Sequence, residues 1–253
     1  MVSVNYNGRL GNNLIQFLAG YLLSRKKGLM FSNRIGNINN LIKHDIEISG
    51  KIFTDLCEVN DENFISILED ERIGGKHFYL NGFFQTKGFL EKYEEVLKSV
   101  LNINYENFDK DTVFVHYRIG DIVNDRRMLP LEYYEEALSK INFTKGYISS
   151  DTINHDFCQK LVKKYNLIPV NLPELELINF AKNFNNIILS EGTFSWWMGF
   201  LSQAENIIYN KRNYYWHGDI FFNRWTNLSW DYEENTIYDI YRLKNYKPIN
   251  LNK

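Results

Sequence analysis

Strand-like apolar runs alternate with amphipathic segments through the second half of the chain, and this alternation restricts the possible folds more than any other feature. Strands are predicted at 112–116, 145–150, 186–190 and 206–209, and helices are predicted from Pro130, around Phe157, from Pro173 to Phe184 and after Gly192. Such alternation is typical of a parallel sheet with helices on both faces. We therefore predict an α/β fold.

The first residues predict a strand, a glycine turn and a helix. Residues 2–6 alternate as a strand does, and apolar side chains then recur at helical spacing from Leu14 to Leu22. Three basic residues at 25–27, followed by Gly28, are typical of a helix C-terminus. Asn12 lies at the start of this helix, where backbone amides can hold an anion, although a turn of this kind is more often structural.

The remainder of the first half is less regular. A helix is expected at 63–71, a strand begins at Phe78, and a helix from Phe89 to Leu101 would place one apolar face toward the core: Phe89, Tyr93, Val96, Leu97 and Val100. We predict an N-terminal domain at 1–108 and a second domain at 109–230. The tail 231–253, with a helix near 234–244, is expected to pack back on the first domain.

Charge and cysteine content exclude several classes of protein. The net charge of -2, with both signs well mixed, offers no basic stripe and argues against a nucleic-acid partner. Cys57 and Cys158 are far apart, so the chain has neither a disulfide framework nor a zinc knuckle. No apolar run approaches the length of a membrane span, and the first residues lack a secretory pattern. We expect a cytoplasmic protein.

The stretch from Val113 to Asp121 is the strongest single candidate for a site. A buried strand runs into His116, Arg118, Gly120 and Asp121, at the strand end where open α/β sheets bind ligands. The planar guanidinium of Arg118 fits phosphate. Considered alone, however, an arginine at a strand end is more often an ion-pair or surface residue.

Polar groups follow two further strands, at Ser149, Ser150 and Asp151 and again at Ser190, Glu191, Thr193 and Ser195. In a parallel sheet all three loops lie on one edge. Together they offer a carboxylate for a base or ribose, and an arginine, hydroxyls and helix-end amides for a diphosphate. The alternative is that Asp151 and Thr193 are only helix caps.

The sequence offers little support for a metal site or for a catalytic triad. The pair Asp109 and Asp111 matches a D-x-D pattern, but it precedes a strand instead of following one, so we predict no metal site. The histidines show no paired ligand spacing, and no nucleophile elbow is present.

Five segments together resemble the α-1,2-fucosyltransferases of glycosyltransferase family 11, and more distantly the protein O-fucosyltransferases and α-1,6-fucosyltransferases. They are 8–16 (GRLGNNLIQ), 81–85 (NGFFQ), 116–121 (HYRIGD), 150–151 (SD) and 193–197 (TFSWW). The resemblance implies a GT-B-like fold, in which two Rossmann-type domains face each other across a cleft. It also implies inverting transfer of L-fucose from GDP-β-L-fucose, without metal or cofactor, to O2 of a galactose.

The same resemblance assigns roles to the predicted site residues. Arg118 would bind the β-phosphate and stabilise charge on the departing GDP, and His116 would support its loop. Ser150 and Asp151 would lie near the guanosine, and Thr193, Phe194 and Ser195 would form the loop around the diphosphate. Asn12 would face the donor from the first domain. Asp121 is a candidate general base, although we favour a role in ordering the loop by pairing with Arg118.

The chain departs from the family at three places: Ile119 replaces a second arginine, Thr152 a second aspartate, and Glu191 with Gly192 an Asn-Ser pair. The protein O-fucosyltransferases have a similar His-x-Arg-Ile. Two alternatives therefore stay open: transfer from another sugar nucleotide, or a catalytically inactive carbohydrate-binding relative. The acceptor implied by the resemblance is a lipid-linked O-antigen or capsule oligosaccharide at the inner face of the bacterial cytoplasmic membrane, which the protein would contact peripherally.

Overall fold

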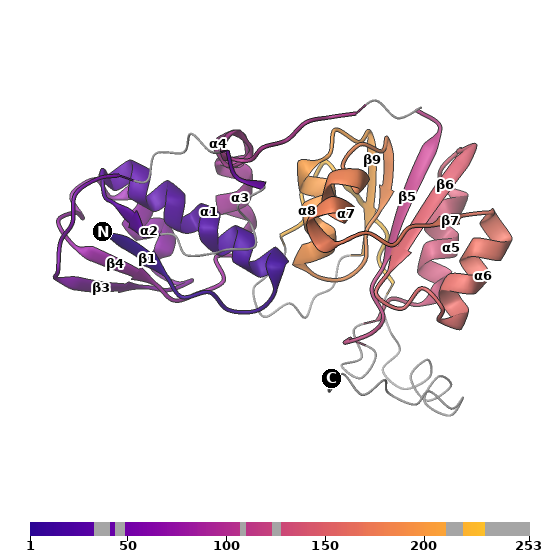
Figure 1. Ribbon diagram of the computed structural model, residues 1–253, viewed down its shortest axis with the longest axis horizontal. Helices are drawn as coiled ribbons and strands as arrows, with labels where there is room; N and C mark the ends of the chain where they lie inside the picture. Colours follow the sequence, from indigo (N-terminus) through magenta and orange to yellow (C-terminus); the bar gives the residue numbers. More distant parts are fainter. Residues whose placement is uncertain (33–40, 44–48, 107–109, 123–127, 211–219, 231–253) are drawn as a thin grey trace.

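The computed structural model describes residues 1–32, 41–43, 49–106, 110–122, 128–210 and 220–230. Within them the chain forms two parallel sheets flanked by helices, a Rossmann-like α/β fold (Figure 1). This confirms the predicted α/β class. The predicted tail helix, Asp109 and the domain boundary at 108/109 lie outside the described residues.

The smaller sheet has the strand order β2-β1-β4-β3, and all of its pairings are parallel. The helix α1 (Leu10–Lys27) follows β1 and is buried along most of its length, because it packs both against this sheet and against the second half of the chain. It ends as predicted, with Gly28 in the left-handed conformation. The other elements are β1 (Val2–Val4), β2 (Phe31–Ser32), β3 (Leu56–Val59), α2 (Phe64–Glu69) and β4 (His77–Leu80).

The helix predicted from Phe89 to Leu101 is wrong as a single element. It is two helices, α3 (Lys87–Lys92) and α4 (Glu94–Val100), which meet at Tyr93 with φ -111° and ψ 13°. Leu97 and Val100 of the second helix face the core as predicted, whereas Val96 is 45% exposed.

The larger sheet has the strand order β10-β9-β8-β5-β6-β7, again entirely parallel. Helices cover both of its faces, α5 and α6 on one side and α7 and α8 on the other (Figure 1). Its elements are β5 (Thr112–Tyr117), α5 (Leu131–Ser139), β6 (Lys145–Ser150), α6 (Asp156–Tyr165), β7 (Ile168–Pro169), α7 (Glu174–Ala181), β8 (Asn186–Ile188), α8 (Thr193–Leu201), β9 (Asn206–Tyr209) and β10 (Thr226–Asn227).

Alternate residues of β5 explain why this strand is buried on both sides. Val113 and Val115 point into the core beneath α5 and α6, whereas Phe114 points into the core beneath α7 and α8. The second of these cores continues into the smaller sheet through the contact of α1 with α8. At that contact Trp197 Nε1 donates a hydrogen bond to the carbonyl of Gly11 (2.8 Å). None of the described helices is long and apolar enough to cross a membrane.

Candidate active site

The order of strands in the larger sheet fixes where a ligand site belongs. From β5 the chain adds β6 and β7 on one side and then β8, β9 and β10 on the other, so the order reverses between β5 and β8. In open α/β sheets ligands bind at such a switch point, outside the carboxyl ends of the strands. The loops after β5, β6 and β8 therefore share one edge, as the sequence predicted. The backbone N–H of Arg118 donates to Ser190 Oγ across this point (2.9 Å).

A cavity of about 420 Å³ opens at this edge, which is within the usual size range of small-molecule sites. The larger sheet contributes one wall and the start of α1 contributes another. Its lining residues include most of the predicted site: Asn12, His116, Arg118, Asp121, Ser150, Asp151, Thr193 and Phe194.

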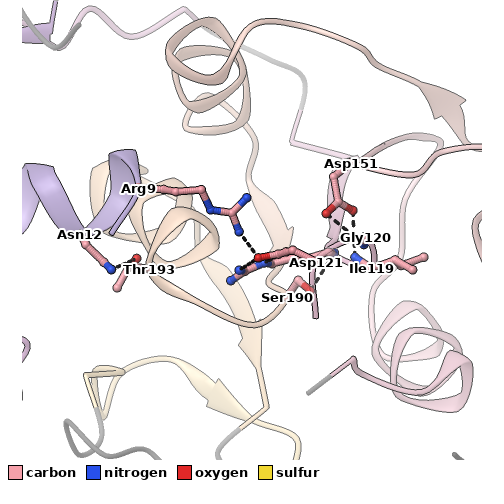
Figure 2. A network of polar contacts seen from close by, with 9 residues as sticks. Arg9, Asn12, Ile119, Gly120, Asp121, Asp151, Ser190 and Thr193 are labelled. Atoms are coloured by element: carbon pink, nitrogen blue, oxygen red, sulfur yellow. Dashed lines mark hydrogen bonds and ion pairs between the residues drawn. The ribbon is translucent and has the colours of Figure 1, made fainter. Parts of the chain in front are cut away.

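Arg118 is held in place by Asp121. Arg118 Nε donates to Asp121 Oδ1 (2.9 Å) and Arg118 Nη2 donates to Oδ2 (2.6 Å), so the pair is bidentate. Arg9, at the start of α1, also donates to Asp121 Oδ2 (Figure 2). Burial alone would raise the pKa of Asp121, but the hydrogen bonds and charge of Arg118 and the charge of Arg9 hold that pKa below its ordinary value. A carboxylate with a lowered pKa is a weak base.

Gly192 makes room for the guanidinium of Arg118. Gly192 has φ +91°, a conformation that glycine adopts without strain, and a Cβ at this position would overlap Arg118 Nη1. The residue directly precedes α8, so the first amides of that helix begin beside the guanidinium. The guanidinium of Arg118 can therefore take this position only while residue 192 is glycine.

Asp151 fixes the backbone that follows Arg118. Its carboxylate accepts the N–H groups of Ile119 (2.9 Å) and Gly120 (3.1 Å), as Figure 2 shows. Ser150 Oγ accepts the N–H of Thr152 (3.0 Å). The helix-cap alternative is wrong for both residues it named: His155 caps α6 in place of Asp151, and α8 has Gly192 at its N-cap while Thr193 Oγ1 donates to Asn12.

Asn12 connects the two walls of the cavity. Asn12 Oδ1 accepts hydrogen bonds from Thr193 Oγ1 (2.7 Å) and from Gln85 Nε2 (2.9 Å). The approach of α1 to α8 is close, because a Cβ on Gly11 would lie 2.6 Å from the backbone nitrogen of Phe194. A side chain larger than hydrogen at position 11 would separate Asn12 from Thr193.

His116 is buried, and its Nδ1 has no hydrogen-bond partner among the described residues. Its ring makes an edge contact with Phe194, the centroids being 5.5 Å apart. Burial lowers the pKa of His116 to about 4, the charge of Arg118 acts in the same direction, and the charge of Asp151 offsets these effects only in part. His116 is therefore a neutral wall of the cavity at physiological pH.

Ser195 was predicted to bind the sugar-nucleotide donor, but the structure places it outside the cavity. Its side chain is fully buried and does not line the cavity. Ser195 Oγ accepts the backbone N–H of Ser190 (2.7 Å), which ties α8 to the end of β8. Sequence alone does not distinguish Ser195 from Thr193, because both follow Gly192 and the phase of the helix comes only from the fold.

Several lining residues were not singled out from the sequence. Arg9 and Gln85 lie inside the quoted segments 8–16 and 81–85, but only the fold brings them to the site. Another wall follows β7, a two-residue strand too short to detect from periodicity, and it consists of Asn171, Leu172, Glu174 and Leu177.

In comparisons with known proteins, no family model matches this chain and no curated protein matches it.

Proposed function

We propose that this protein is an inverting glycosyltransferase that moves L-fucose from GDP-β-L-fucose to a hydroxyl group of an oligosaccharide, with O2 of a galactose as the expected acceptor atom. The observation that carries the proposal is the position of Arg118, whose guanidinium borders the cavity at the switch point beside the start of α8. A diphosphate leaving group needs positive charge and hydrogen-bond donors at such a place.

In the reaction, the acceptor oxygen attacks the anomeric carbon from the face opposite the phosphate, and the bond from that carbon to the β-phosphate oxygen breaks. The hydroxyl proton passes to a base, and the electron pair of the broken bond stays on GDP. Arg118 stabilises that charge, so the proposed transfer requires no metal or cofactor. The lowered pKa of Asp121 favours its role as the partner of Arg118 over a role as the base.

The proposal also takes the two sheets as the two sides of a GT-B-like cleft. Support comes from the cavity walls, because Asn12 and Gln85 come from the half that carries the smaller sheet and Arg118 and Thr193 from the half that carries the larger one. The donor would lie on the larger sheet and the acceptor would approach from the smaller one. The expected acceptor is a lipid-linked surface-glycan precursor, met at the inner face of a bacterial cytoplasmic membrane.

Two measurements test this function. Calorimetry with GDP, UDP and CMP should show binding of GDP, and binding of UDP without GDP would overturn the guanosine assignment. Mass spectrometry of products from galactose-terminated acceptors should show addition of fucose by the wild type and none by Arg118→Ala. Arg72→Ala is the matched control, because Arg72 is also an arginine paired with a carboxylate, Asp70, but lies outside the cavity. Binding of GDP without transfer or donor hydrolysis would identify a catalytically inactive relative.

A further inference from the structure

We propose that Arg9 is a second phosphate-binding residue of this cavity, supplied from a different wall than Arg118, and that the Asp121 carboxylate competes with a bound diphosphate for both guanidinium groups. This inference rests on the proposed function, because it concerns the diphosphate of the same donor.

The first support is the geometry at Asp121. Its Oδ2 accepts hydrogen bonds from Arg118 Nη2, which follows β5, and from Arg9, which precedes α1. Figure 2 shows Arg9 beside Asp121. Two guanidinium groups that converge on one carboxylate are spaced to hold one small anionic group between them. Phosphate oxygens present the same acceptor chemistry as a carboxylate.

The second support is the side chain of Ile119. Ile119 follows Arg118 directly, but it is fully buried in the apolar core beneath α5 and α6. Position 119 therefore offers only its backbone N–H, which Asp151 accepts. Arg9 is the remaining cation among the described residues that line the cavity.

The charge balance of the cavity supports the same role. Its described charged residues are two arginines, Arg9 and Arg118, and three carboxylates, Asp121, Asp151 and Glu174. Arg9 reduces the excess of negative charge in this lining from two to one, which lowers the repulsion of a diphosphate. The side chain of Arg9 is 64% exposed and that of Arg118 is 17% exposed, so Arg9 has the freedom to turn toward a ligand.

A double-mutant cycle separates direct binding from an indirect effect through Asp121. Calorimetry would measure GDP, inorganic pyrophosphate and guanosine on the wild type, Arg9→Ala, Asp121→Asn and the double variant. Loss of a charge-assisted contact should weaken GDP binding about tenfold or more in Arg9→Ala. The same loss should persist in the Asp121→Asn background, and guanosine binding should not change.

Two results would overturn the inference: unchanged GDP affinity in Arg9→Ala, or a loss that disappears when Asp121 is already asparagine, which would show that Arg9 only orients that carboxylate. Arg72→Ala is the control for removal of an ion-paired arginine at the surface. If the wild type binds neither GDP nor pyrophosphate, the proposed function fails as well. If it binds GDP and Arg9→Ala binds it equally well, only the role of Arg9 fails.

Discussion

The guanidinium of Arg118 lies where a side chain on residue 192 would be. Because residue 192 is glycine there is room for it, whereas a Cβ at this position would overlap Arg118 Nη1. The two residues come from the ends of adjacent strands, β8 and β5, at the point where the strand order reverses. The position of the Arg118 guanidinium therefore depends on the absence of a side chain at Gly192.

We predict that Gly192→Ala disrupts nucleotide binding beyond its effect on stability. With φ +91° and ψ 166°, Gly192 lies in a backbone region that is almost exclusive to glycine, so alanine should cost about 1 to 3 kcal/mol. Displacement of Arg118 should in addition weaken GDP binding measured by calorimetry. Gly28→Ala is the matched control, since Gly28 also has positive φ but has open space at its Cβ. Both variants should lose stability, and only Gly192→Ala should lose affinity. Equal GDP binding by the two would contradict the steric relationship.

Gly11→Ala should force α1 away from α8, because the new Cβ would lie 2.6 Å from the nitrogen of Phe194. Overpacking of this kind typically costs about 1 to 3 kcal/mol, to be measured by urea denaturation. Gly88→Ala, in the short helix α3, is the control because its Cβ would meet nothing within 4 Å. That control should retain or gain stability, since alanine favours a helix. Wild-type stability in Gly11→Ala would show that the contact can relax freely.

The neutral state of His116 predicts a pH dependence of stability. The pKa of His116 is lowered to about 4 by burial, whereas an unfolded histidine titrates near 6.5. Below pH 6.5 the unfolded chain binds a proton that the folded protein does not, so stability should fall by about 3 kcal/mol in total as pH drops through the window from 6.5 to 4.

Denaturation of wild type and His116→Gln across this window isolates the contribution of His116 from those of His77 and His155, whose pKa values burial also lowers. The glutamine variant should lose less stability on acidification. An NMR titration that places the pKa of His116 above 6 would refute the prediction.

Asp151 should be needed for ligand affinity more than for stability. Its carboxylate accepts the N–H groups of Ile119 and Gly120, but it is exposed, so water can replace it and Asp151→Ala should cost about 1 kcal/mol or less. GDP binding should weaken because the backbone after Arg118 loses its anchor. Asp151→Asn retains one acceptor oxygen and should bind with intermediate affinity. If Asp151→Ala binds GDP with wild-type affinity, Asp151 does not contribute to GDP binding and the prediction is wrong.

Local patterns in the sequence determined much of this fold. The alternation of helix and strand from 112 to 209, the end of α1 at Gly28 and the polar groups after β5, β6 and β8 all depend on neighbouring residues, so periodicity and turn chemistry suffice to predict them. The break at Tyr93 and the short strand β7 escaped prediction, because neither changes the apolar pattern enough to be recognised.

Only the tertiary structure decided which of these groups meet. Arg9 and Asp121 are 112 residues apart, and nothing local to either indicates the other. The order β8-β5-β6 brings Ser190 to Arg118, and the phase of α8 turns Ser195 inward while Thr193 reaches Asn12. The sequence by itself determined that an arginine, Arg118, follows a buried strand. The packing of α1 against α8 determined that a second arginine, Arg9, lies near it. Contacts of this kind join distant segments, so they follow from the whole core and not from any one sequence pattern.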